Sequence, residues 1–208
     1  MVAFDAEYDR EMLESSYNAI HHKDSLEFMI GDSEREIILQ KVTATLTIPA
    51  NASLSFQNLF RLTLSNGQFY IAQCLLNYGF SASSRSASFT EHKYYFQTVG
   101  IADIKIDLGN TLFRRETKTD KIIGRFFGND IDFEGTKEFN EKYYLVSDMK
   151  EAVVNCCDKN FLNTIAKYDD IVLTTKGKEM FITFDTDFEE KQSRIVEDIF
   201  GKCKFLLA

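Results

Sequence analysis

Residues 54–71 read LSFQNLFRLTLSNGQFYI, and this stretch predicts a β-hairpin. Before the Asn66-Gly67 pair, apolar residues fall at nearly every second position, which places them on one face of an extended strand. Asn-Gly tolerates the positive φ angles of a type I′ turn, whose twist matches that of paired strands. A two-residue turn at this pair puts Leu62 opposite Ile71, so the apolar residues of both strands share one face.

The composition is that of a folded, acidic protein. The chain has 208 residues, 44% of them hydrophobic, with 19 Phe and a single Pro, which indicates one large domain or two small ones and argues against disorder. Its net charge of -8 disfavours nonspecific binding to nucleic acid or to an anionic membrane surface. We therefore expect no nucleic-acid partner.

The cysteines and the N-terminal residues indicate a reducing compartment. Two of the four cysteines are adjacent and no CxxC spacing occurs, so we expect free thiols at Cys74, Cys156, Cys157 and Cys203. Residues 1–10 are acidic and lack the apolar segment of a signal peptide. No stretch approaches the ~18 apolar residues of a membrane span. We expect a cytoplasmic protein.

Residues 1–110 are predicted to form an N-terminal helix followed by an antiparallel sheet. Apolar residues at three- and four-residue spacing over residues 5–22 make the stripe of an amphipathic helix. Besides the hairpin, period-two patterns and short apolar runs predict strands over residues 26–30, 38–48, 94–99 and 104–108. The serine-rich residues 79–90 predict a loop.

Residues 111–208 are predicted to form a smaller unit in the order strand, helix, hairpin, helix. Residues 142–147 predict the strand, and Asp148 with Glu151 has the spacing of a helix N-terminal cap. A second helical stripe follows over residues 158–168. Such an order is typical of a small α+β unit.

The hairpin of this unit covers residues 171–184 and turns at Gly177 together with one of its two neighbours. Both alternatives place the same apolar residues on one face. Thr186 with Glu189 has the spacing of a capping box and predicts the start of the final helix. The sequence therefore predicts an α+β protein with two regions, either separate or packed as one domain.

Three groups of side chains suggest chemistry, and each has a structural alternative. His21, His22 and Asp24 could hold a metal ion, but adjacent residues on a helix point in different directions, which favours a solvated helix end. His92 could form half of an acid–base pair, but no nucleophile motif accompanies it. Cys156 or Cys157 could act as a nucleophile, but their apolar neighbours favour buried, inert thiols. We expect no catalytic residue, cofactor or metal ion.

The best candidate for a binding site is a concentration of basic residues after the predicted sheet region. It consists of Arg114, Arg115, Lys118, Lys121 and Arg125, interrupted by Glu116 and Asp120. Such a cluster could contact an anion or an acidic partner, and the alternative is an ordinary solvated face.

Residues 139–148 read FNEKYYLVSD. Together with the capped helix, the hairpin at Gly177 and the final helix, they resemble the soluble part of an uncharacterised bacterial family with a domain of unknown function. The resemblance covers about residues 113–184 and implies no catalytic residues. Members of that family are commonly membrane-anchored, whereas this chain has no hydrophobic anchor segment. A cytoplasmic relative and an excised soluble region are both compatible with it.

These observations favour a non-enzymatic binding or scaffolding module, because no polar group of catalytic type is visible. The alternative is a hydrolase-like enzyme whose site is assembled from scattered residues. A pocket that combines His92 or Cys157 with a carboxylate would favour the enzyme, and a broad exposed patch without one would favour the module. The expected partner is another protein or a second copy of the chain, with membrane association only through a partner or a missing anchor.

Overall fold

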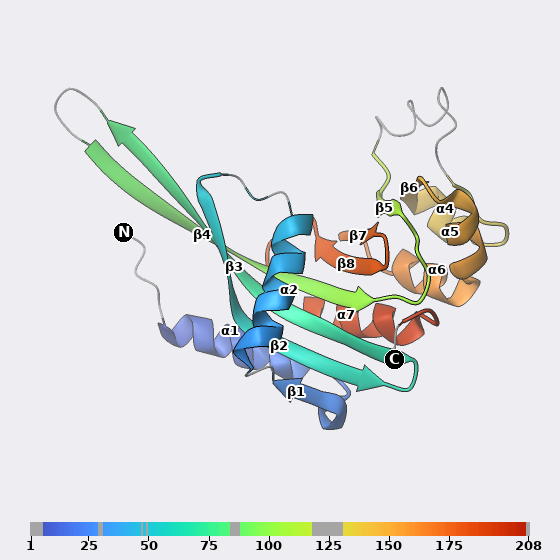
Figure 1. The fold of residues 1–208 in the computed structure, drawn as a ribbon, viewed down its shortest axis with the longest axis horizontal. Coiled ribbons are helices and arrows are strands. Elements are labelled where there is room, and N and C mark those ends of the chain that lie inside the picture. The colour runs from blue at the N-terminus through green and yellow to red at the C-terminus, as the bar shows by residue number, and fades with distance from the viewer. Residues whose placement is uncertain are drawn as a thin grey trace.

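The structure, a computed structural model, describes residues 6–28, 31–46, 48, 50–83, 88–117 and 131–206 (Figure 1). The strands are β1 Leu26–Phe28, β2 Ala52–Leu64, β3 Gly67–Ser83, β4 Ser88–Asp103, β5 Asn110–Arg115, β6 Tyr143–Ser147, β7 Ile171–Lys176 and β8 Glu179–Phe184. The helices are α1 Ala6–Ala19, α2 Asp32–Thr45, α4 Lys137–Lys142, α5 Lys150–Cys156, α6 Lys159–Ala166 and α7 Lys191–Lys202, with a short 3-10 helix, η1, at Lys23–Ser25.

All eight strands belong to one antiparallel sheet in the order β1-β2-β3-β4-β8-β7-β5-β6. The predicted α+β class is therefore confirmed. The pairing of β4 with β8 joins the N-terminal strands to the C-terminal hairpin, with Gly100 opposite Ile182 and Asp103 opposite Glu179. The two regions expected from the sequence thus share a single sheet.

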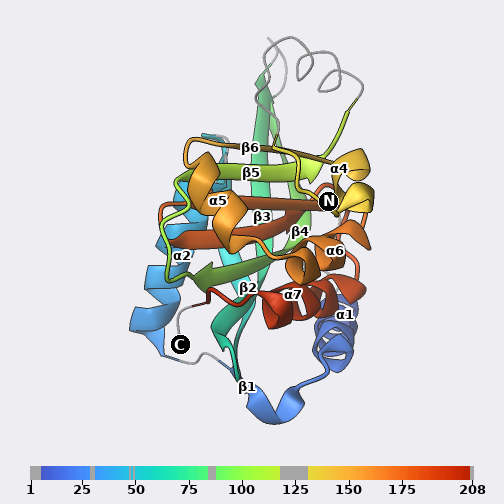
Figure 2. The same cartoon turned by 90° about the vertical axis from the view of Figure 1, so that its right-hand side faces the viewer.

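Helices cover both faces of the sheet, because alternate residues of the strands are apolar on each side (Figure 2). One face carries Phe60, Leu62 and Phe69, which belong to the larger core beneath α6 and α7. The opposite face carries Leu59 and Phe56 in a smaller core beneath α2. Helix α1 packs against α7 and extends the larger layer.

The predicted hairpin is present and its apolar face is correct from Phe60 to Ile71, but its turn lies elsewhere. Leu64 pairs with Gly67 and Leu62 pairs with Phe69, so the chain reverses at Ser65 and Asn66. Among the described residues only glycines have positive φ, with Gly67 at 145°, which contradicts a type I′ turn at Asn66-Gly67. A register shift of two residues leaves the apolar residues from Phe60 to Ile71 on their predicted face. A β-bulge between Phe56 and Asn58 turns Leu54 and Phe56 to the opposite face, so the prediction is wrong for these two residues.

The structure contradicts the strand predicted over residues 38–48. Those residues lie largely in α2, where Ile38 and Val42 are the buried positions. Residues four apart share a face both in a strand, with its period of two, and in a helix, with its period of 3.6. The pattern therefore fits both structures, and packing of α2 on the smaller core decides for the helix.

The serine-rich segment is also strand rather than the predicted loop. β3 and β4 stay paired in register as far as Ser83 opposite Ser88, and residues 84–87 lie outside the described part. β2 begins at Ala52, opposite Tyr78, and does not extend beside the rest of β3. Residues 79–83 and 88–92 therefore project from the body as a two-stranded arm (Figure 1). Threonine and aromatic residues within it suit a strand.

Other expectations are confirmed in part. The strands at 26–30, 94–99 and 142–147 and the hairpin at 171–184 are present, whereas residues 104–108 form only an isolated bridge from Ile104 to Leu206. Neither proposed cap binds its helix, since α5 and α7 show no side-chain cap. Asp148 instead accepts hydrogen bonds from the backbone N–H of Asn110 at 2.8 Å and from its side-chain amide at 2.7 Å, and thereby ties α5 to β5.

We predict that Gly100→Ala destabilises the fold, because α7 lies directly on β4 at this residue. A Cβ there would lie 2.5 Å from Val196 Cγ1 and 2.9 Å from Phe200 Cε2. Overpacking of this kind lowers the free energy of unfolding by roughly 1–3 kcal/mol. Gly79→Ala is the matched control, since the nearest atoms to its added Cβ lie at 3.8 Å. Urea melts of both variants test this, and equal losses would contradict it.

Candidate functional site

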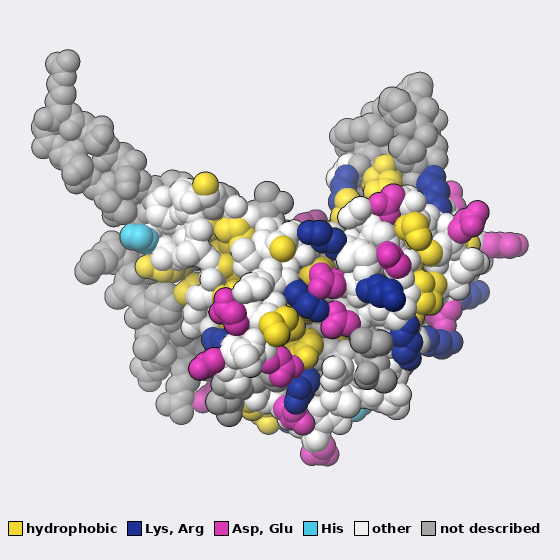
Figure 3. Space-filling view, in the orientation of Figure 1, with side chains coloured by type: hydrophobic (Ala, Val, Ile, Leu, Met, Phe, Trp, Pro, Cys, Tyr) yellow, Lys and Arg dark blue, Asp and Glu magenta, His cyan; other side chains and the backbone are white. Residues whose placement is uncertain are grey.

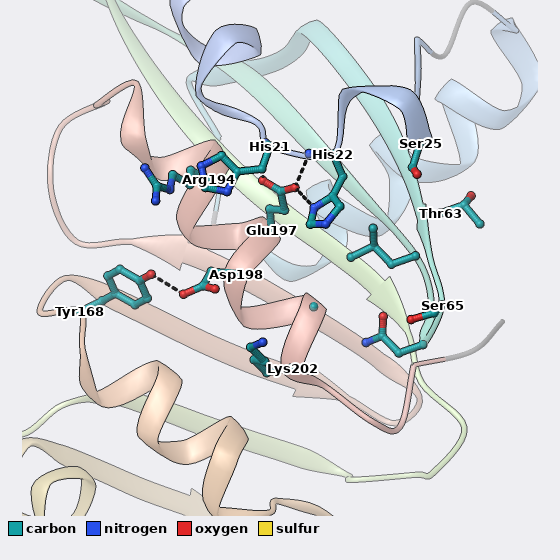
Figure 4. Close-up of a pocket in the computed structure, with 13 residues that line it drawn as sticks. His21, His22, Ser25, Thr63, Ser65, Tyr168, Arg194, Glu197, Asp198 and Lys202 are labelled. Atoms are coloured by element: carbon teal, nitrogen blue, oxygen red, sulfur yellow. Dashed lines mark hydrogen bonds and ion pairs between the residues drawn. The ribbon is translucent and has the colours of Figure 1, made fainter.

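A pocket of about 440 Å³ lies against one side of α7, and we call it the α7 pocket. It is lined by three further parts of the chain: the link from α1 to η1, the turn between β2 and β3, and Tyr168 after α6 (Figure 4). Arg194, Glu197, Asp198 and Lys202 line it from α7, at spacings that place them along one face of the helix. The pocket falls within the size range of small-molecule sites.

Glu197 is the buried carboxylate of this pocket, with a relative exposure of 4%. It accepts hydrogen bonds from the backbone N–H groups of His21 and His22, both at 2.8 Å, and contacts His22 Nδ1 at 2.5 Å. The contact places the imidazole of His22 directly against this carboxylate. Glu197 therefore holds the end of α1 against α7 and orients the imidazole.

The second carboxylate, Asp198, accepts a hydrogen bond of 2.7 Å from the hydroxyl of Tyr168. Burial, followed by this hydrogen bond, raises the pKa of Tyr168 to about 12. The phenol therefore keeps its proton near neutral pH and remains a donor to Asp198.

Asn66, at the turn between β2 and β3, hydrogen-bonds to the C-terminal end of α7. Its side-chain amide donates to the carbonyl oxygens of Phe200 at 2.8 Å and Cys203 at 2.7 Å. The last carbonyls of a helix have no partner within the helix, and this amide satisfies two acceptors of that end. The contact also explains the position of the turn, because the side chain of Asn66 is held by the helix.

A histidine paired with a buried carboxylate is half of an acid–base site. Within the described residues, no serine, threonine or cysteine side chain forms a hydrogen bond with the ring of His22, so no nucleophile is activated there. His22 and Glu197 are 175 residues apart in the chain, and no local pattern indicates the pair. The only sequence signal was the adjacent His21-His22 dipeptide.

His92 and Cys157, the side chains that the sequence suggested for an enzyme, do not lie beside a carboxylate of the described residues in the arrangement that catalysis would need. His92 Nδ1 lies 3.0 Å from the side-chain oxygen of Asn77, which is an amide rather than a carboxylate. Cys157 is buried, and burial raises the pKa of its thiol well above the ordinary value, which favours the inert form. No three His, Cys, Asp or Glu side chains in the described part of the chain are grouped so as to hold a metal ion.

The predicted basic cluster is described only at its first two residues. Arg114 and Arg115 lie at the end of β5, with the Arg114 guanidinium 5.6 Å from the centre of the Tyr144 ring and Arg115 at 4.0 Å from Asp169. Lys118, Lys121 and Arg125 lie outside the described residues. Basic and acidic side chains are intermixed on the face shown in Figure 3. The anion-binding role of the cluster stays a prediction.

A second hollow, of about 400 Å³, lies beside β4 near the base of the arm, and we call it the Tyr95 groove. One wall carries aromatic side chains, and Tyr94 and Tyr95 are 40% and 48% exposed. The Phe96 and Phe188 rings meet edge to face at 6.3 Å. The remaining lining residues are all acidic: Glu11, Asp187, Glu189 and Glu190.

No family model, curated protein or solved structure matches this chain. The resemblance of residues 139–148 to a bacterial family therefore stays a prediction. Within the described residues, no helix combines the length and the apolar character needed to cross a membrane.

We predict that Glu197→Ala weakens the fold, because it leaves the N–H groups of His21 and His22 without their acceptor. Loss of a charged hydrogen-bond partner lowers the free energy of unfolding by roughly 1–3 kcal/mol. Glu138→Ala, at an exposed position of α4, is the control and should change it by less than about 0.5 kcal/mol. Chemical denaturation measures the free energy of unfolding of both variants. A decrease for Glu197→Ala no larger than for the control would show that the carboxylate does not hold the segment between α1 and η1 in place.

We predict four free thiols with unequal reactivity. All four cysteines are unpaired, and Cys156 is the least buried of them. Burial raises the pKa of every one of these thiols, so the thiolate is scarce throughout and access decides the rate. A disulfide exchange reagent should therefore modify Cys156 first in the native protein and all four after denaturation. Cys156→Ser should abolish the fast phase, and fewer than four thiols in denaturant would contradict the assignment.

Proposed function

We propose that this protein is a non-enzymatic binding module that takes an extended, basic segment of a partner protein along the open edge of β4. The observation that carries the proposal is the pairing of β4. It pairs with β3 from Ser88 to Ile101 but with β8 only over Gly100–Asp103. From Ser88 to Val99, no described strand pairs with its other edge.

An open strand edge presents backbone N–H and C=O groups that a further strand is able to pair with. Addition of a strand to such an edge is a common mode of peptide recognition. The arm would gain stability from such an added strand, because a two-stranded ribbon is only marginally stable in water without further packing. An added strand along β4 would give the base of the arm a third strand.

The chemistry of the Tyr95 groove defines the segment. Glu189 forms an ion pair of 2.6 Å with Lys191, whereas Asp187 and Glu190 have no ion pair among the described residues. The exposed face of Tyr95 attracts cations through its ring electrons. An acidic groove in a protein of net charge -8 favours lysine or arginine side chains and repels acidic ones.

The competing function is an enzyme of hydrolase type, and the His22–Glu197 pair is the observation that favours it. Such an enzyme would use His22 as a general base toward water, since no side-chain nucleophile is hydrogen-bonded to it among the described residues. The open edge of β4 lies outside this pocket and has no part in that chemistry.

We predict that a labelled peptide of alternating Lys and Val binds the protein and that charge reversal in the groove weakens binding. Asp187→Lys with Glu190→Lys should reduce affinity by roughly ten-fold or more, because like charges then face each other. Glu138→Lys with Glu141→Lys makes the same change of net charge on α4 and should leave affinity within about two-fold, since only distant charges change and salt screens them. Fluorescence polarisation measures both.

Hydrogen exchange locates the peptide. Amides of β4 between residues 93 and 99 should become protected in the complex if a strand is added there. Equal binding of an alternating Glu and Val peptide, or equal loss in the groove and control variants, would overturn the proposal.

A further inference from the structure

We propose that the α7 pocket binds a small phosphorylated ligand, with the phosphate held between Arg194 and Lys202. This site is separate from the groove at β4 and does not depend on the proposed protein partner. The carboxylates and helix-end carbonyls around the pocket are hydrogen-bonded to other parts of the protein, whereas its two basic side chains, Arg194 and Lys202, form no ion pair among the described residues.

The carboxylates and helix-end carbonyls of the pocket already receive donors from the protein. Glu197 receives two backbone N–H groups and the ring of His22, and Asp198 receives the hydroxyl of Tyr168. The carbonyls at the end of α7 receive the amide of Asn66. These internal donors occupy part of the acceptor capacity of the wall, although the carboxylates of Glu197 and Asp198 keep their charge.

The strong donors of the pocket have no such partners. Arg194 and Lys202 both line it and form no ion pair among the described residues. They lie eight residues apart on α7, about 12 Å along the helix axis, and their long side chains are able to converge on one ligand. A guanidinium matches two phosphate oxygens at once, and an ammonium adds a point charge.

Other basic side chains of the described residues do form ion pairs with carboxylates. Lys41 contacts Asp103 at 2.6 Å and Glu179 at 3.2 Å, and Lys204 contacts Asp158 at 2.5 Å. In a chain with 24 basic and 32 acidic residues, carboxylate partners are abundant. Arg194 and Lys202, without an ion pair among the described residues, both line one pocket, where an anion from outside the chain is able to contact them together.

The rest of the lining indicates what carries the phosphate. Ser25 and Ser65 bring hydroxyl groups from the η1 segment and from the turn between β2 and β3 (Figure 4). Hydroxyls both donate and accept, which suits the hydroxyls of a sugar. A volume of about 440 Å³ accommodates a sugar phosphate.

The test is calorimetric titration of the full chain with ribose 5-phosphate and with inorganic phosphate, at matched ionic strength. We expect ribose 5-phosphate to bind, and Arg194→Gln with Lys202→Gln to weaken it by roughly ten-fold or more, because both charge-assisted contacts are lost. Lys159→Gln with Lys176→Gln removes two exposed lysines elsewhere and should leave the affinity within about two-fold.

The second ligand separates a sugar phosphate from a free ion. If the hydroxyl groups of the pocket contact the sugar, inorganic phosphate should bind roughly five-fold more weakly or worse. Absence of binding of either ligand, equal affinity for the two, or an equal loss in both double variants would overturn the proposal. Both pairs of substitutions lie at exposed positions, so a folded protein is expected in each case.

Discussion

The pairing of β4 with β8 is the constraint on which the rest of the structure depends. It joins strands from the first half of the chain to the C-terminal hairpin, and it brings α7 across the sheet at Gly100. The helix approaches so closely that no side chain fits between it and the strand at this residue. Both candidate sites follow from this contact, because one lies along α7 and the other along the part of β4 that β8 leaves unpaired.

Helix α7 organises its surroundings through polar groups as well as through its apolar face. Glu197 fixes the link after α1, Asp198 fixes the segment after α6, and Asn66 fixes the β2–β3 turn at the end of the helix. Each contact joins segments far apart in the sequence. They supply donors to the acceptors around the pocket, whereas Arg194 and Lys202 form no ion pair within the described part of the chain.

The two sites have opposite charge preferences within one acidic protein. The Tyr95 groove gathers carboxylates beside exposed aromatic rings, whereas the α7 pocket gathers unpaired cations beside carboxylates that already have donors. Net charge alone therefore describes neither of them. The charged groups of each site, and whether each already has a partner in the protein, indicate the kind of ligand that the site would bind.

The sequence alone determined those features that depend on neighbours a few residues apart. The apolar face of the C-terminal hairpin is correct, and so is that of the first hairpin from Phe60 to Ile71, because a period of two acts locally and a shift of two residues leaves it unchanged. The bulge that turns Leu54 and Phe56 to the other face has no signal in the alternating pattern. Only the tertiary structure decided that Ile38 and Val42 lie on a helix, since their spacing suits either element until the sheet offers a face to cover. It also decided the pairing of His22 with Glu197, because contacts across 175 residues arise from packing, which no local pattern encodes.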